Sequence, residues 1–234
     1  MKTILRPSGE QYFLKDAIRD LVVVVVGILA AVWLESAWQD RLDRAEETLL
    51  LQGLRTEFAE NREQLVDRLL VWSNVRESSL EARQLMGQSV DNIGADQIRK
   101  SFRSALMMRF YDPRSGQLSS LINSGKLGLI QNANLRARIA DWPSLIDDMK
   151  IEREGALQIL METLGPHLGE FIMDGPPGGP FEDRLEALLS DRRIYNDLGN
   201  MAGTMNRSIR EGNEILASTD DIIAMIDAEF EGSP

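Results

Sequence analysis

An unbroken apolar run near the N-terminus constrains the fold of this chain more than any other feature. Residues 21–34 read LVVVVVGILAAVWL, fourteen residues without a charge. A helix over residues 21–38 would be about 27 Å long at 1.5 Å per residue, close to the thickness of the hydrocarbon layer of a membrane. Glu35 would be its only charged residue. The run therefore predicts a transmembrane helix.

Three other interpretations of the run are weaker. The five valines at 22–26 favour a buried β-strand, but the sequence has no second β-rich run to pair with it. A core helix of a soluble domain carries a polar stripe, whereas residues 21–34 are apolar on every face. A cleaved signal peptide fits the basic start, yet Trp33, Glu35 and Trp38 follow where a small-x-small cleavage site is required. The signal peptide is the main alternative to a span.

Flanking residues predict the orientation of the span. Trp33 and Trp38 at one end, with Tyr12 and Phe13 beyond the other, are the aromatic rings typical of a membrane interface. The first twenty residues hold four Lys or Arg, more than the segment just after the span. The positive-inside rule then places the N-terminus in the cytoplasm and residues 39–234 in the periplasm, with a single pass through the bacterial inner membrane. Absence of cysteine suits either compartment and excludes a disulfide framework.

The charge distribution predicts a short tail at 1–20, the span at 21–38 and an acidic domain at 39–234. The tail has four basic and three acidic side chains, and Glu35 adds one negative charge, so the whole net charge of −11 belongs to the domain. A domain of this sign repels phosphate backbones and anionic lipid surfaces, which excludes nucleic acid as a partner. The length allows one sizeable core.

Beyond the span, apolar residues recur with the period of an α-helix. The first predicted helix follows the span without a hinge and buries Leu51, Leu54, Phe58, Leu65, Leu69, Trp72 and Leu80. After a loop at 87–94, the second buries Ile98, Phe102, Leu106 and Phe110. A short helix follows with Leu118, Leu121 and Ile122. The next stripe is Leu135, Ile139, Trp142, Ile146, Met149, Ala156, Leu160, His167 and Phe171. Phe181, Leu185 and Leu188 lead into a last helix with Ile194, Leu198, Met201, Met205, Ile209, Leu216, Ile223, Ile226 and Phe230.

Glycine and proline predict where these helices end. Residues 112–116, Asp-Pro-Arg-Ser-Gly, predict a turn. Pro143 lacks a backbone donor and should kink or restart its helix, as should Pro166 after Gly165. Residues 174–180, rich in Gly and Pro, predict the clearest break. The pattern as a whole predicts an all-α fold, in which an N-terminal transmembrane helix continues into an elongated antiparallel helical bundle of three long and two shorter helices.

Residues 124–132, Ser-Gly-Lys-Leu-Gly-Leu-Ile-Gln-Asn, predict a corner of the bundle. Gly125 supplies the left-handed residue that closes one helix, Lys126 faces the negative end of that helix, and Asn132 caps the next. The residues predicted to enter the core are Leu127, Leu129 and Ile130. The functional alternative is that Ser124, Lys126 and Asn132 line a small anion site. The spacing is not that of a phosphate loop, G-x-x-x-x-G-K-[ST], so nucleotide binding has no support.

Two blocks of the sequence resemble a bacterial family of small single-span membrane proteins known only as a domain of unknown function. The first block is Val25-Val26-Gly27-Ile28-Leu29-Ala30-Ala31, followed by Trp38 and Arg41, and matches V-V-G-I-L-x-A. The second is residues 124–132, followed by Leu135-Arg136 and Trp142, and matches S-G-K-L-x-L-I-x-N. The resemblance covers nearly the whole chain and departs from the family at the Gly/Pro loop and Pro143. It implies a membrane-anchored helical protein and carries no known activity.

Residues with catalytic chemistry are sparse. His167 is the only histidine and there is no cysteine, which excludes Cys/His zinc sites and Cys/His nucleophile pairs. Leu164 stands where a di-iron E-x-x-H motif requires Glu. The acid pairs 147–148 and 220–221 are consecutive, not stacked on one helix face, and predict surface or cap charges. We therefore expect a hydrogen-bonded core or rim histidine at 167, no enzyme activity, no metal and no cofactor.

Methionines recur at helical spacing and predict core filling, with a pliable binding groove as the alternative. They are Met161, Met173, Met201 and Met205. Within the span, Gly27 and Ala31 form a small-xxx-small face on which a second transmembrane helix can pack closely. The expected partners are membrane lipid and either another membrane protein or a second copy of the chain.

Two classes of function fit these expectations. In the first, the protein is a membrane-anchored accessory or scaffolding subunit of a membrane protein complex. In the second, the bundle is an extracytoplasmic sensor of a small ligand or envelope state. A sensor needs a signalling part in the cytoplasm, and the tail of about twenty residues before the span is short for one. The accessory role is therefore the preferred prediction.

Overall fold

The computed structural model describes the backbone of residues 9–172 and 184–232, and side chains from residue 19 onward within those ranges. Every regular element in these ranges is a helix, so the all-α prediction is confirmed. The chain divides into two units, residues 1–50 and 51–234. The predicted Gly/Pro break at 174–180, together with Met173 and Phe181, lies outside the described residues.

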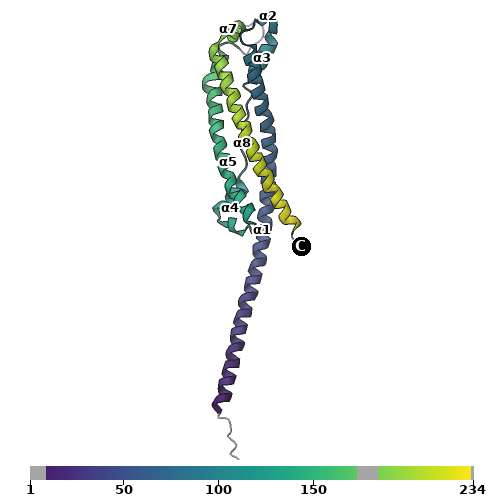
Figure 1. Ribbon diagram of the computed structural model, residues 1–234, viewed down its shortest axis with the longest axis vertical. Coiled ribbons are helices and arrows are strands. Elements are labelled where there is room, and N and C mark those ends of the chain that lie inside the picture. The colour runs from purple at the N-terminus through teal and green to yellow at the C-terminus, as the bar shows by residue number, and fades with distance from the viewer. Residues whose placement is uncertain (1–8, 173–183, 233–234) are drawn as a thin grey trace, which may run out of the picture. The chain divides into compact units, whose positions relative to one another are not determined.

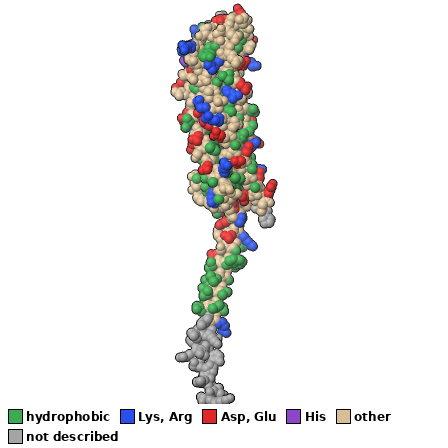
Figure 2. Space-filling view, viewed as in Figure 1, with side chains coloured by type: hydrophobic (Ala, Val, Ile, Leu, Met, Phe, Trp, Pro, Cys, Tyr) green, Lys and Arg blue, Asp and Glu red, His purple; other side chains and the backbone are tan. Residues whose placement is uncertain are grey.

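The first unit consists of the beginning of α1 (Gly9–Leu85). Helical structure in α1 is unbroken, which confirms that the apolar helix continues into the first helix of the bundle. The large apolar side chains between Leu21 and Trp38 are all 45–72 % exposed. They gather along this helix in Figure 2. Among the described residues, α1 is the one helix whose length and composition match a membrane span or a signal sequence.

In the second unit, α8 (Arg192–Glu231) runs antiparallel to α1. The side chain of Arg55 pairs with Asp227, and Arg62, seven residues later, pairs with Asp220, seven residues earlier. The guanidinium of Arg55 holds the pKa of the Asp227 carboxyl below its usual value, chiefly by hydrogen bonding. Steps of seven on both helices show that the two keep a constant register.

The third long helix, α5 (Ala133–Gln158), also packs antiparallel to α8 (Figure 1). Asn132 Nδ2 donates to Glu229 at 2.7 Å near one end, and Arg207 Nε donates to Glu152 at 2.9 Å farther along. Because α1 and α5 both oppose α8, they are parallel to each other. The connection between them must therefore return along the bundle.

Short elements complete the second unit. Between α1 and α5 lie α2 (Val90–Ile93), α3 (Ala95–Ser104), α4 (Gly116–Asn123) and the 3₁₀ helix η1 (Lys126–Leu129). Between α5 and α8 lie the π-helix η2 (Ile159–Leu164), α6 (Gly165–Gly169) and α7 (Leu185–Ser190). The loop predicted at 87–94 thus includes one short helix, which Ser89 caps by accepting from the amide of Asp91.

The core follows a seven-residue repeat, the spacing of a coiled-coil seam. On α1 the buried positions are Leu51, Leu54, Phe58, Asn61, Leu65, Trp72, Val75, Ser79 and Ala82. On α8 they include Ile194, Leu198, Met201, Met205, Ser208, Gly212, Ile215, Thr219, Ile222 and Ile226. Small and polar residues occupy some of these positions because the helices approach closely there. A Cβ on Gly212, for example, would lie 2.9 Å from Leu69 Cδ2 and 3.0 Å from Trp72 Cζ3.

Several residues that the sequence predicted to be buried are not, because the seven-residue repeat of the core selects other positions. Leu80 is 41 % exposed. The half-buried positions are Leu69, Ile209, Leu216, Ile223 and Phe230. The sequence pattern predicted that these large apolar side chains form the buried stripe. In the structure, the seven-residue repeat instead buries the neighbouring Ser79, Ser208, Ile215 and Ile222. Contact across the bundle, not side-chain size, sets the buried face.

The π-helix η2 changes the buried face of the helix that contains it. Leu160 and His167, predicted as core, are half-buried, whereas Leu164 and Leu168 are buried. A π-turn adds a residue to the helix and rotates everything that follows. Gly165 permits this turn, since a Cβ there would lie 2.3 Å from the carbonyl oxygen of Leu160. Of the two effects predicted for Pro143, a kink or a restart, the restart does not occur, because α5 continues through this residue.

Candidate functional site

The returning connection between α1 and α5 is the feature that builds the candidate site. The second predicted helix ends at Ser104, so Leu106 and Phe110 lie beyond it, and residues 107–115 contain no helix, strand or turn. The turn predicted at 112–116 is therefore wrong. We call residues 106–115 the return segment. Polar side chains of α1 hold it along its length.

Three α1 side chains donate to carbonyls of the return segment. Trp72 Nε1 donates to the carbonyl of Arg109 at 2.8 Å, and Arg68 Nε donates to the carbonyl of Phe110 at 2.9 Å. Asn61, only 2 % exposed, makes a pair of bonds with one residue. Its Nδ2 donates to the carbonyl of Arg114 at 2.7 Å, and its Oδ1 accepts from the amide of Arg114 at 2.8 Å.

Glu57 anchors the end of the return segment. Its carboxylate accepts from the amides of Gln117 at 2.7 Å and Leu118 at 3.0 Å, in the first turn of α4. Ser115, at the N-cap position, makes no side-chain cap bond, so Glu57 supplies the acceptor and the negative charge that a helix N-terminus favours. This cap comes from a residue far away in the sequence.

The spacing of these contacts shows that the return segment is extended. From Trp72 back to Glu57 is about 22 Å along α1 at 1.5 Å per residue. The partners of these two residues, Arg109 and Gln117, are eight residues apart. Each residue of the segment therefore covers about 2.8 Å, near the extended limit of a chain.

A small cavity of about 40 Å³ lies between the return segment, α5 and α8. Its lining includes the apolar side chains Trp72, Met108, Phe110, Ile146, Met149 and Met205. A groove of about 340 Å³ adjoins it between α4 and α5. Cavity and groove share Asp112, Pro113, Ile146 and Lys150 as lining residues. They are therefore neighbouring parts of one depression.

Tyr111 lines the cavity and is 6 % exposed. Its hydroxyl is buried and has no hydrogen-bond partner among the described residues. Burial raises the pKa of this hydroxyl well above its usual range, so it is neutral and available as a donor. A buried hydroxyl without a partner costs on the order of 1–3 kcal/mol, which makes it a candidate for binding a ligand.

Two cationic side chains, Lys150 and Arg153, line the same cavity. The guanidinium of Arg153 lies over the ring of Phe110, 5.3 Å from its centroid, and no carboxylate of the described residues pairs with it. Lys150 Nζ lies 2.7 Å from Asp147. With Asp112, the charged residues lining the cavity sum to +1 in a chain of net charge −11. Asp147 offsets the charge of Lys150, so Arg153 is the cation at this cavity that no carboxylate of the described residues pairs with.

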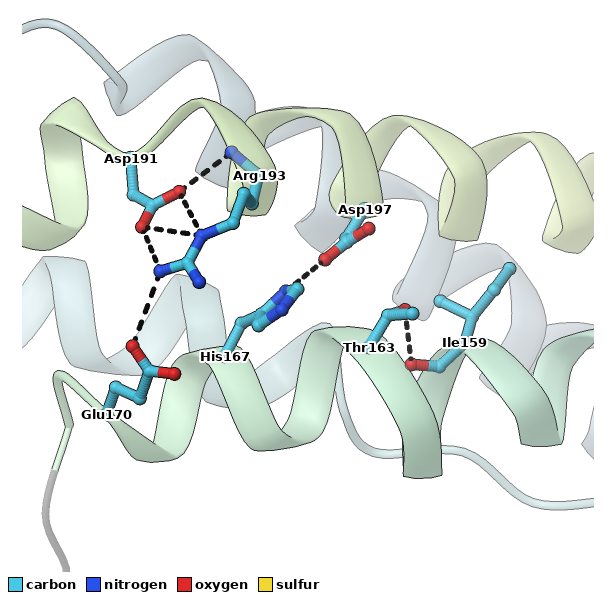
Figure 3. Close-up of polar contacts among 7 residues, drawn as sticks. All are labelled: Ile159, Thr163, His167, Glu170, Asp191, Arg193 and Asp197. Atoms are coloured by element: carbon cyan, nitrogen blue, oxygen red, sulfur yellow. Dashed lines mark hydrogen bonds and ion pairs between the residues drawn. The ribbon is translucent and has the colours of Figure 1, made fainter.

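His167 lies in a separate polar cluster where α6 meets the first turns of α8 (Figure 3). Its Nδ1 is 2.7 Å from Asp197 Oδ2, and its side chain is 24 % exposed. The prediction of a hydrogen-bonded core or rim histidine is confirmed, and the structure places the side chain at the rim. Thr163, one turn earlier, donates its hydroxyl to the carbonyl of Ile159 at 3.0 Å. Both side chains are thus engaged in structural contacts.

The rest of this cluster joins the ends of two helices (Figure 3). Asp191 caps α8 by accepting from the amide of Arg193 at 2.7 Å. The guanidinium of Arg193 contacts both Asp191, at 2.7 Å, and Glu170, at 3.3 Å. Arg193 holds the pKa of the Asp191 carboxyl below its usual value, chiefly by side-chain hydrogen bonding. The cluster has a complete structural explanation.

At the predicted corner, Gly125 is left-handed with φ +70°, as expected. Asn132 caps α5 by accepting from the amides of Asn134 and Leu135, which confirms that prediction too. The hydroxyl of Ser124 donates to the carbonyl of Leu121 at 3.2 Å. Lys126 begins η1 and is exposed. Ile130 is buried, whereas Leu127 and Leu129 are only half-buried because the 3₁₀ turn leaves them at the surface. These contacts explain the motif as a helix corner.

The remaining predicted features are distributed over other surfaces. Gly27 and Ala31 lie on the exposed helix of the first unit, and nothing lies within 4 Å of a Cβ built on Gly27. Of the acid pairs, Asp147, Asp220 and Asp221 form surface ion pairs with Lys150, Arg62 and Arg138. Met201 and Met205 fill the core, whereas Met161 is 65 % exposed.

The sequence did not predict the cavity, because its lining residues come from segments that are far apart in the chain and that carry no unusual motif. The only local signal was that Asn61, Arg68 and Ser79 interrupt a seven-residue repeat of apolar positions on α1. A search for polar residues at seam positions would have found two anchors of the return segment, Asn61 and Arg68. It would not have shown that Tyr111 lacks a partner.

No protein-family model, curated protein or solved structure matches this chain. The resemblance to a family of single-span membrane proteins therefore stays a prediction that rests on its two motifs.

Proposed function

We propose that this protein is an accessory or scaffolding subunit of a membrane protein complex in the bacterial inner membrane. The part of α1 that belongs to the first unit crosses the membrane once. The N-terminus lies in the cytoplasm, and the acidic bundle lies in the periplasm. The bundle docks on the exposed part of a partner protein, and the chain has no catalytic activity of its own. The family resemblance agrees with this proposal.

The observation that carries the proposal is the exposed apolar surface of the first unit. Large apolar side chains between Leu21 and Trp38 remain 45–72 % exposed, and none of the apolar window is buried. Exposure of this much apolar surface to water costs roughly 25 cal/mol per Å², so the segment is stable only in lipid or against another protein. Lys and Arg before the span support the orientation.

The anchor and its orientation make the first prediction. Full-length protein is expected to stay in the membrane pellet through an alkaline carbonate wash. Protein beginning at Gln39 is expected to be soluble and strongly helical by circular dichroism. A reporter that is active only outside the cytoplasm should work after Pro234 and fail before Lys2. Release of full-length protein by the wash would exclude an integral span, and the opposite reporter pattern would place the bundle in the cytoplasm.

Packing of the span against a partner makes the second prediction. Gly27→Leu places a large side chain on the small-residue face and should keep the partner helix at a distance, weakening association by about 1 kcal/mol or more. The matched control is Val25→Leu, which lies about 200° around the helix from Gly27. The measurement is recovery of co-purified membrane proteins, or of a tagged second copy, in mild detergent at equal expression. Equal recovery with both variants would remove this face from the proposal.

A further inference from the structure

We infer that the depression formed by the cavity beside Tyr111 and its adjoining groove is a binding site for a small amphipathic carboxylate. The carboxylate occupies the cavity, where it accepts from the Tyr111 hydroxyl and faces the guanidinium of Arg153. The alkyl chain lies in the groove between α4 and α5. This site belongs to the bundle alone and does not depend on the role of the membrane span.

Sizes support this orientation. The cavity, at about 40 Å³, exceeds the 10–15 Å³ that one water requires and suits a compact headgroup. The groove, at about 340 Å³, falls in the range of small-molecule sites, about 300–1,000 Å³. Leu118 and Trp142 are each 2 % exposed and form its apolar floor, with Ile146 beside them. An alkyl chain fits this floor, because it buries apolar surface without leaving polar groups unpaired.

Charge distinguishes the two ends. Lys150 and Arg153 against Asp112 give the cavity a lining of net charge +1. The groove contains Asp112, Asp147 and Lys150, and its lining has net charge −1. Asp112 and Lys150 line both ends, so the difference comes from Arg153 at the cavity and Asp147 in the groove, and these two residues favour a carboxylate at the cavity end. An ammonium headgroup would have the opposite preference, because the guanidinium of Arg153 repels it at the cavity end.

The buried hydroxyl gives the site its specificity. A site built to hydrogen-bond a ligand oxygen discriminates strongly against a ligand that lacks it, because the buried donor then stays unpaired. No group in the described part of the chain forms a hydrogen bond with the Tyr111 hydroxyl. Met108, Met149 and Met205 are flexible side chains around the cavity, so it can adapt to ligands of different bulk.

The test uses full-length protein in phosphatidylcholine nanodiscs, with empty nanodiscs to subtract partition into lipid. Isothermal titration calorimetry would compare hexanoate with hexan-1-ol and hexylammonium. We expect hexanoate to bind at least ten-fold more tightly than either. The exposed residue Arg153 can be changed without threatening the core, and Arg153→Gln should reduce the affinity for hexanoate about ten-fold while leaving that for hexan-1-ol unchanged. Arg138→Gln, at a surface arginine that pairs with Asp221, is the control.

Tyr111→Phe separates a ligand site from a structural role. It should weaken hexanoate binding at least ten-fold and at the same time raise the melting temperature without ligand, because an unpartnered buried hydroxyl is removed. Tyr195→Phe, at a tyrosine that is 40 % exposed, should change neither quantity. The inference is overturned if hexanoate binds no better than hexan-1-ol, or if Tyr111→Phe and Arg153→Gln both leave the affinity for hexanoate unchanged.

Discussion

Replacement of Asn61 by leucine is expected to lower the free energy of unfolding by about 1–3 kcal/mol, because two hydrogen bonds are lost and each contributes about 0.5–1.5 kcal/mol. Asn61 is 2 % exposed, and its amide group makes both hydrogen bonds with the backbone of Arg114, at 2.7 and 2.8 Å. Leucine has a similar volume but can form no hydrogen bond with the amide or the carbonyl of Arg114. The return segment should also exchange its amide hydrogens faster.

The matched control for this prediction is Asn74→Leu, at an exposed position of the same helix. A surface substitution of this kind usually changes stability by less than about 0.5 kcal/mol. Urea unfolding followed by circular dichroism, together with hydrogen exchange of residues 106–115, would measure both effects. If the two leucine variants have equal stability, the polar anchors do not hold the return segment.

Replacement of Gly212 by leucine is expected to destabilise the bundle by about 3 kcal/mol, the upper range for overpacking a well-filled core. A Cβ alone would lie 2.9 Å from Leu69 Cδ2 and 3.0 Å from Trp72 Cζ3, so a full side chain must push α8 away from α1. Because Trp72 also donates to the carbonyl of Arg109, this displacement should disturb the return segment as well.

The same substitution at Gly203 is the control, because Gly203 lies in the same helix with only Arg207 Nη1 near its Cβ, at 3.9 Å. Gly203→Leu should be neutral or stabilising by up to about 1 kcal/mol, since leucine has the higher helix propensity. Opposite signs at the two glycines, measured by thermal unfolding, are the expected result. Equal destabilisation at both would mean that α8 tolerates no side chain, and the close approach at Gly212 would not be the cause.

Local chemistry made part of this structure predictable from the sequence. The apolar helix, its continuation into the bundle and the all-α class follow from composition and periodicity, which act within one or two helical turns. The left-handed Gly125 and the Asn132 cap follow from backbone sterics and from the unpaired amides at a helix start. A hydrogen-bonded histidine at 167 was also predictable, whereas its position at the rim and its partner Asp197 were not.

The tertiary structure alone decided the rest. Which residue of each repeat is buried depends on where neighbouring helices touch, so Ser79 and Ser208 are buried while Leu80 is exposed. The return segment is extended because side chains more than forty residues away, Asn61 and Arg68, pair with its amides and carbonyls. Long-range hydrogen bonds of this kind leave no periodic trace in a sequence. The unpartnered hydroxyl of Tyr111 and the cavity beside it exist only where the return segment, α5 and α8 come together in the assembled bundle.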